Sequence, residues 1–145
     1  MAAPLYTWEF VTDLWGDRVP KIVTLEASAN LETKVGTALI ATSGQVDEAT
    51  ASVSLFLGLA AEATAAALSA ADPIKVALIA PGMVIKGTAD ADASALSGFS
   101  GKLGDFNSDG SLDVADTTNG CLSVWRTEDA GLTVYCVVNN IMFAA

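Results

Sequence analysis

The chain of 145 residues contains no histidine. This absence excludes the Ser-His and Cys-His pairs of nucleophilic catalysis, imidazole ligands for zinc and the usual proton shuttle near neutral pH. Carboxylate pairs, lysine bases and Ser-Lys chemistry remain open to such a chain, but none has a recognisable spacing in this sequence. The sequence therefore predicts a protein that is not an enzyme.

Basic residues are also scarce: 7 Lys and Arg stand against 17 Asp and Glu, which gives a formal net charge of −10. A surface this acidic repels phosphate backbones, so we expect no direct contact with nucleic acid. Long apolar runs are missing as well. The longest uncharged stretch, residues 130–145, is shorter than the roughly 20 apolar residues of a membrane-spanning helix. We expect no membrane segment, and no secretory signal because Glu9 and Asp13 precede the first basic residue, Arg18.

Only two cysteines occur, Cys121 and Cys136, on two predicted strands that flank a turn at residues 128–131. A strand register that opposed position 121 to position 136 would place both side chains on one face and allow a disulfide. The alternative, which the pattern favours, is a pair of small buried thiols in a protein made in a reducing cytoplasm. No C-x-x-C motif or cysteine cluster indicates a metal site.

Apolar residues, in contrast, are abundant. They make up 52% of the chain, and the mean hydropathy is +0.46. Alanine inflates both values without adding much burial energy, but the surplus still favours a protein that hides surface against its own copies or a partner. The length is that of one domain with a real core.

The pattern from residue 21 onward is that of short β-strands separated by Gly, Pro, Asn, Asp and Ser. Between residues 74 and 87, a strand with period-two alternation ends at Pro81-Gly82, the residues of a type II turn, and a second strand follows. Repeated short strands predict a mainly β domain over residues 21–145, a compact barrel or sandwich with at most one short helix. The β-prone runs are residues 21–25, 35–41, 52–59, 74–80, 83–86, 121–126 and 132–138.

Residues 1–20 carry four aromatic side chains, Tyr6, Trp8, Phe10 and Trp15, before the regular β pattern begins. The first three alternate with Thr7 and Glu9, so an extended segment would place these rings on one side. Two interpretations stay open. The segment is either a first strand that packs its rings on its own core, or an extended arm whose rings contact a neighbouring subunit or partner.

Residues 105–116 form the one sharp chemical motif, because they match a twelve-residue EF-hand loop and resemble the calcium loops of dockerins. The loop lacks the usual final Glu, a second loop and helical flanks. The alternative is a β-hairpin that turns at Ser108-Asp109-Gly110, so calcium is only a possible cofactor and we predict none. The calcium ligands would be Asp105, Asn107, Asp109, Ser111, Asp113 and Asp116.

The order of several segments resembles that of small tailed-phage capsid decoration, or cement, proteins. The resemblance rests on V-G-T-A-L-I-A-T-S-G-Q-V at residues 35–46, S-L-F-L-G-L-A-A-E at 54–62 and the strand that ends in Pro81-Gly82. It implies a structural virion protein, made in the host cytoplasm, that forms a homotrimer on the outer capsid surface and bridges copies of the major capsid protein. The four N-terminal aromatics would then be capsid or subunit contacts. The rival from another class is a calcium-dependent binding module that uses residues 105–116.

The alanine-rich residues 60–71 receive two different predictions. Alanine is the best helix former and Pro73 would end a helix, so propensity predicts a short helix. The resemblance to decoration proteins implies a loop of variable length instead.

Overall fold

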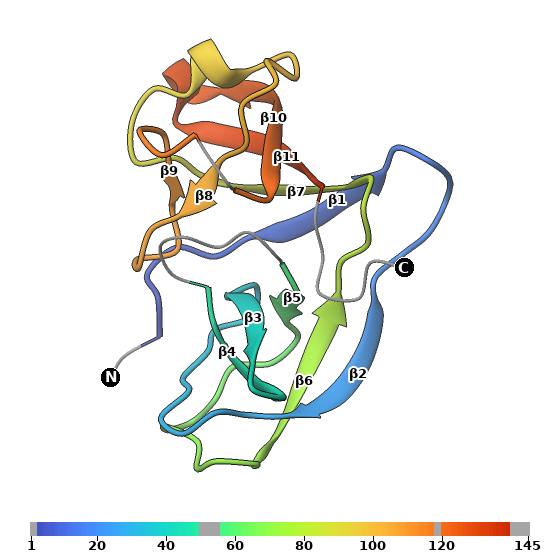
Figure 1. Cartoon of the computed structure of the whole chain (residues 1–145), viewed down its shortest axis with the longest axis vertical. Helices are drawn as coiled ribbons and strands as arrows, with labels where there is room; N and C mark the ends of the chain where they lie inside the picture. Colours follow the sequence, from blue (N-terminus) through green and yellow to red (C-terminus); the bar gives the residue numbers. More distant parts are fainter. Residues whose placement is uncertain (1–2, 50–55, 118–119, 140–145) are drawn as a thin grey trace.

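The computed structural model describes residues 3–49, 56–117 and 120–139 of the chain. The predicted mainly β class is confirmed: these residues contain eleven strands, two 3-10 turns and no α-helix. The strands are arranged in a four-stranded, a five-stranded and a two-stranded sheet (Figure 1). Residues 52–55 of the predicted run 52–59 lie outside the described residues.

The four-stranded sheet is entirely antiparallel and has the order β1-β7-β11-β10. Its first edge, β1, is irregular at Val11, where the pairing with β7 shifts by one residue. Its other edge, β10, is covered by the backbone amides of Gly98 and Phe99, which donate to Trp125 and Val124. The strands are β1 (Glu9–Asp13), β7 (Met83–Thr88), β10 (Leu122–Glu128) and β11 (Thr133–Val138), and the 3-10 turns η1 (Ser94–Leu96) and η2 (Asp129–Gly131) lie beside them.

The five-stranded sheet has the order β2-β6-β5-β3-β4 and curves until its two edges meet at one bridge between Ala27 and Val46. The amide of Ser28 also donates to the Val46 carbonyl, at 2.8 Å. A small core of Leu39, Ile74 and other buried side chains fills the curve. The strands are β2 (Lys21–Glu26), β3 (Ala38–Thr42), β4 (Gln45–Glu48), β5 (Gly58–Ala60) and β6 (Pro73–Leu78).

The predicted Pro81-Gly82 turn is the corner at which the chain passes from one sheet to the other. The Met83 amide donates to the Ala80 carbonyl at 3.1 Å, and Gly82 has a φ of +91°, which glycine adopts without the steric cost of a side chain. The strands before and after this turn, β6 and β7, therefore belong to different sheets instead of forming a hairpin (Figure 1).

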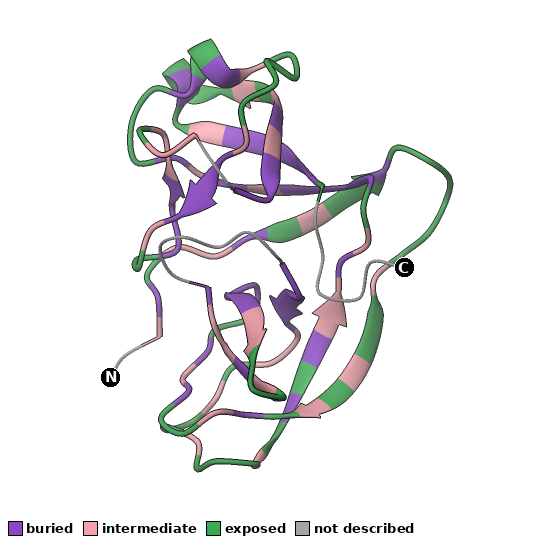
Figure 2. Ribbon diagram, in the orientation of Figure 1, coloured by how far each residue is buried: buried purple, intermediate pink, exposed green. Residues whose placement is uncertain are grey.

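The main core lies between the sheets and is closed by the two-stranded hairpin of β8 (Asp105–Phe106) and β9 (Leu112–Asp113). Burial is dense on β5, β7 and β11, while the β1–β2 connection is exposed (Figure 2). Phe106 stacks on Phe56 at 5.5 Å between ring centroids. Both residues are fully buried, and a buried Phe side chain stabilises a fold by about 1.5–3 kcal/mol.

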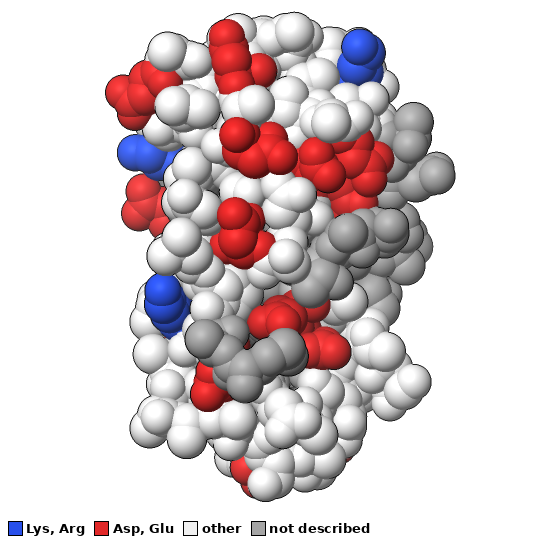
Figure 3. All heavy atoms as spheres, turned by 90° about the vertical axis from the view of Figure 1, so that its left-hand side faces the viewer, with Lys and Arg blue, Asp and Glu red and all other residues white. Residues whose placement is uncertain are grey.

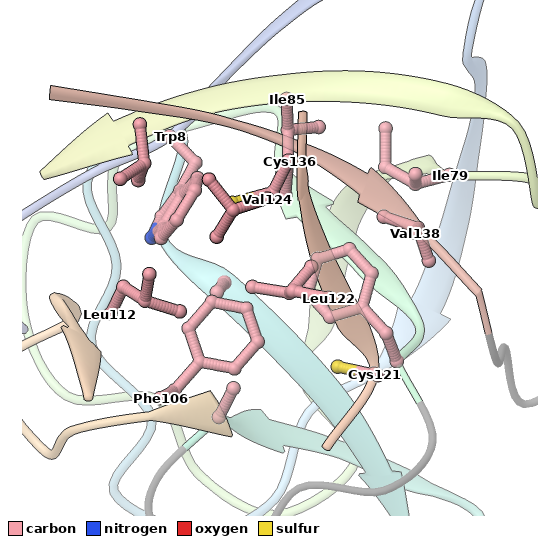
Figure 4. Close-up of a cluster of buried hydrophobic side chains, with 14 of the residues drawn as sticks. Trp8, Ile79, Ile85, Phe106, Leu112, Cys121, Leu122, Val124, Cys136 and Val138 are labelled. Atoms are coloured by element: carbon pink, nitrogen blue, oxygen red, sulfur yellow. The ribbon is translucent and has the colours of Figure 1, made fainter. Parts of the chain in front are cut away.

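Both cysteines lie in this core as free, buried thiols (Figure 4). The register that would oppose them is not formed: Cys136 faces Val124, whereas the Cys121 carbonyl accepts a hydrogen bond from the Asn139 amide. Burial raises the pKa of the Cys121 thiol to about 12. The buried-thiol interpretation therefore describes this pair, and their chemistry is that of small apolar side chains.

Ala60 ends β5 and residues 61–71 form a loop, so the propensity-based prediction of a helix over residues 60–71 is wrong. The loop lies beside residues 30–33 and exchanges backbone hydrogen bonds with them. The amides of Thr64 and Leu68 donate to the carbonyls of Thr33 and Leu31, and the Asn30 amide donates to Leu68. These tertiary bonds use the backbone groups that a helix would pair internally, and they outweigh the preference of alanine.

Candidate interaction surface

Trp8, one of the four N-terminal aromatics, is part of the main core. Only 2% of it is exposed, and its ring meets Phe106 edge-on at a centroid distance of 5.6 Å. Its Nε1 donates to the carbonyl of Gly110 at 2.7 Å. The interpretation as a first strand therefore describes Trp8, which offers no side-chain surface to a partner (Figure 4).

The segment before β1 also fixes the turn of the acidic hairpin. The Tyr6 amide donates to the Asp109 carbonyl at 2.8 Å. Gly110 has a φ of +91°, and a Cβ built on it would lie 2.2 Å from the Tyr6 carbonyl oxygen. Sequence reasoning treated the aromatic N-terminus and the acidic loop as separate features, and no local signal in either one indicates that they touch.

Residues 105–116 adopt the hairpin that was the alternative to a calcium loop. The Asn107 amide donates to the Ser111 carbonyl at 2.8 Å and closes the turn. Asp109 Oδ1 accepts the Ser111 amide and hydroxyl, and Asp113 Oδ1 accepts the Ala115 amide. These carboxylates shape the local backbone as Asx turns do.

The same side chains do not converge on a common point that could hold a cation. Asp105 is buried, with 1% exposed, and its Oδ1 accepts the Phe106 amide. The Asn107 side-chain nitrogen donates to the Asp90 carboxylate and to the Ser111 hydroxyl. Within the described ranges, no group of three or more Asp, Glu, Cys or His side chains is arranged to hold a metal ion. The geometry therefore does not fit the calcium loop that the sequence suggested, and calcium binding stays an untested hypothesis.

The remaining aromatics of residues 1–20 differ in exposure. Tyr6 is half-buried, and Phe10 is half-buried where it packs on the edge of the main core. Trp15 is different, because 80% of it is exposed. Of the four aromatic side chains predicted as contacts, Trp15 alone is largely exposed.

Trp15 belongs to a run of exposed apolar side chains that we call the apolar segment. Nine large hydrophobic side chains are exposed among the described residues, and five of them lie within residues 11–22. An isolated exposed hydrophobic residue needs no explanation, but such a concentration is typical of interaction surfaces. The five are Val11, Leu14, Trp15, Val19 and Ile22.

The connection from β1 to β2 that carries this segment is held by an ion pair between the buried Asp13 carboxylate and the half-exposed Arg18 side chain. Arg18 Nε lies 2.5 Å from Asp13 Oδ2, and the Asp13 side chain is fully buried. Arg18 also donates to the Pro81 carbonyl at 2.8 Å, while the Leu14 amide donates to Gly82 at 2.9 Å. The hydrogen bonds from Arg18 lower the pKa of Asp13 to about 2. The exposed side chains thus stand on a backbone that is already ordered.

A groove of about 420 Å³ continues this surface across the end of the four-stranded sheet. The apolar side chains that line it include those of Leu14, Trp15, Phe99, Val137 and Val138. None of the residues that line it is ionisable. The sequence analysis did not assign Asp13, Arg18 or Phe99 to this surface. The one available signal was the opposite charges of Asp13 and Arg18 on either side of Trp15 in the sequence.

No described helix is both long enough and apolar enough to cross a membrane. A scan of protein-family models gave no match, and neither the curated proteins nor the solved structures contained a similar chain or fold.

Proposed function

We propose that this protein is a structural decoration protein that stabilises a phage capsid by bridging copies of the major capsid protein. The observation that supports the proposal best is the apolar segment, a concentrated hydrophobic surface on a small β scaffold whose backbone is pinned by Asp13 and Arg18. Preordered apolar contacts bind without a large cost of ordering the surface. The phage setting comes from the resemblance in residues 35–82.

The distribution of charge is consistent with an orientation on the capsid. The face seen in Figure 3 carries many acidic and few basic side chains. The acidic hairpin β8–β9 lies on that side of Figure 1, while the β1–β2 connection lies on the opposite side. We propose that the apolar side faces the capsid and neighbouring copies, and that the acidic side faces solvent on the outside of the virion.

In the proposed role the protein binds capsid subunits to one another and catalyses no reaction. Each bridge between capsid subunits would add buried interface that resists the outward pressure of packaged DNA. The partners would be the major capsid protein and further copies of this chain, in a homotrimer, and no cofactor, membrane or nucleic acid would take part.

The test is co-sedimentation of the purified protein with DNA-free shells of the major capsid protein from the virus that encodes the chain. We expect saturable binding by the wild-type chain. Val19→Asp should weaken it strongly, because it places a charge in an apolar contact at a residue that is 72% exposed and free to vary without unfolding the chain.

The matched control is Leu132→Asp, at a residue that is 47% exposed and lies at η2, away from the apolar segment. It should bind like the wild type. If the wild-type protein stays in the supernatant at every ratio, the proposed function is wrong. If both aspartate variants bind normally, the capsid contact lies elsewhere on the molecule.

A further inference from the structure

A second apolar feature lies near the apolar segment, on the other side of β1. It is an open hollow of about 300 Å³ between β1 and β2, at the edge of the main core. Phe10 and Ala77 contribute to its lining, and Ile22 and Val35 form exposed parts of its rim, with 61% and 64% of their surface accessible. Glu9 is the only ionisable residue in the lining, and Lys86 lies 4.0 Å from its carboxylate.

The hollow exists because small side chains stand where the two sheets diverge. Ile22 on β2 pairs with Ala77 on β6, which in turn pairs with Leu59 on β5. Ala60 and Ala61 follow Leu59 and also line the space. A cavity of about 150 Å³ accepts a benzene ring. The hollow therefore has room for a larger aromatic side chain.

Trp15 is a suitable occupant by its chemistry and its presentation. Its ring lies flat on the Pro81-Gly82 turn, so closely that a Cβ on Gly82 would lie 1.8 Å from Trp15 Cδ1. The bonds of Asp13, Arg18 and Leu14 hold the backbone on both sides of it. Tryptophan is enriched among residues that dominate binding energy, and one presented at 80% exposure on an ordered backbone loses little entropy on docking.

Trp15 does not fill the hollow of its own chain, because it rests on Gly82 and is absent from the residues that line the hollow. We propose that Trp15 of one copy inserts into the hollow of a second copy, between Phe10, Ile22 and Val35. This inference rests on the proposed function, since it assigns part of the same apolar segment to contacts between copies. The contact would join two largely apolar surfaces, in which Glu9 beside Lys86 is the one ionisable lining residue, on a chain with a net charge of −10 whose other faces repel each other.

The projecting residue and the hollow are different surfaces of one molecule. A contact of this kind is heterologous, so successive copies close into a ring if the rotation permits, and two copies can also exchange tryptophans reciprocally. Both arrangements use the same pair of surfaces, and the mass of the assembly distinguishes them.

The experiment measures the mass of the full chain in solution by sedimentation velocity over a range of concentrations. We expect a defined oligomer for the wild type. Trp15→Ala should raise the dissociation constant at least about thirtyfold, as expected for the loss of a residue that dominates an interface. Ala77→Phe, which fills the hollow, and Val35→Glu, which places a charge on its exposed rim, should do the same. Leu132→Ala is the exposed control and should leave the mass unchanged.

Mixing two defective variants gives the decisive result. Trp15→Ala keeps its hollow and Val35→Glu keeps its tryptophan, so one intact contact remains between them, and equal amounts should form a 1:1 dimer. Circular dichroism identifies a variant that fails to fold, and Val35→Glu is chosen because Val35 is 64% exposed.

The inference is overturned if the wild type remains a monomer at the highest soluble concentration, if Trp15→Ala keeps the wild-type mass, or if the mixture stays monomeric. Its failure is distinguishable from failure of the proposed function, because co-sedimentation with shells is measured separately. An oligomer that does not bind capsids would contradict only the capsid role. Capsid binding by a monomer would contradict only the Trp15 contact.

Discussion

The two halves of the N-terminal region, residues 1–10 and 11–20, each carry one tryptophan, and the two tryptophans have opposite roles in the structure. Trp8 is 2% exposed and packs on Phe106, whereas Trp15 is 80% exposed and rests on the Pro81-Gly82 turn. The difference arises from position along β1. Trp8 precedes β1 and its ring lies in the main core against Phe106 of the β8–β9 hairpin. Trp15 follows β1, beyond the last pair of the β1–β7 ladder. Aromatic content alone therefore does not distinguish a core strand from a contact surface.

Truncation of the two tryptophans breaks this comparison most directly. Trp8→Ala should lower the free energy of unfolding by about 3–5 kcal/mol, because it leaves a cavity in the core and an unpaired Gly110 carbonyl. Trp15→Ala should change it by less than about 1 kcal/mol, because the ring buries little surface within the chain. Urea denaturation of both variants and the wild type measures the two values, at a protein concentration low enough that the chain is monomeric, because association would add to the apparent stability. Equal losses would show that the distinction between the tryptophans is wrong.

Gly110→Ala tests how the N-terminal segment holds the acidic hairpin. The added Cβ would collide with the Tyr6 carbonyl, and alanine is strained at a φ of +91°. We expect a loss of about 1–3 kcal/mol, measured by the same denaturation experiment. Asp109→Ala at the neighbouring position should cost less than about 1 kcal/mol, because the carboxylate only shapes the turn. A harmless Gly110→Ala would indicate that the Tyr6 segment does not press on this turn.

The ion pair of Asp13 and Arg18 predicts a dependence of stability on pH. The pKa of Asp13 is lowered from 3.8 to about 2 by the hydrogen bonds from Arg18, so the folded state favours the ionised carboxylate. This contribution is fully present above about pH 4 and is lost as pH falls through about 2. Asp13→Asn should lower the melting temperature at pH 7. It should also make the melting temperature fall less steeply as the pH drops from about 4 to about 2. A decline of unchanged steepness would show that other carboxylates dominate the acid response.

Much of the fold could be predicted because its signals are local. The alternation at Ile74 and Val76 predicted a strand, and both side chains are buried in β6. The turn predicted at Pro81-Gly82 is present and is closed by the bond from Met83 to Ala80. The register of the cysteines could not be predicted in this way. Positive φ values at Asp129 and Ala130 and a shift in the β10–β11 pairing beside Trp125 set which residues face each other. Turn geometry fixes the register of a hairpin, and sequence spacing alone does not give it.

The candidate surface was predictable only in part, because its elements meet through tertiary structure. Trp15 was nominated as a contact residue from its type, but Phe99 joins it in the groove from more than 80 positions away in the sequence. The hollow depends on the absence of side-chain volume at Ala61 and Ala77, which no motif reports. Conversely, the acidic loop had the strongest motif, and its side chains are used for turn formation within the hairpin.

Removal of divalent cations should have the smallest effect. A protein that binds calcium only when folded gains stability in proportion to the logarithm of the calcium concentration over its dissociation constant, so chelation would lower its melting temperature. The hairpin is instead closed by the bond from Asn107 to Ser111, and the turn of Gly110 is held by Tyr6 and Trp8. We therefore expect the same melting temperature in excess chelator and in excess calcium, by differential scanning calorimetry. Magnesium at the same ionic strength is the control for screening of the acidic surface. A drop on chelation that calcium restores and magnesium does not would make residues 105–116 a calcium loop and favour the binding-module interpretation.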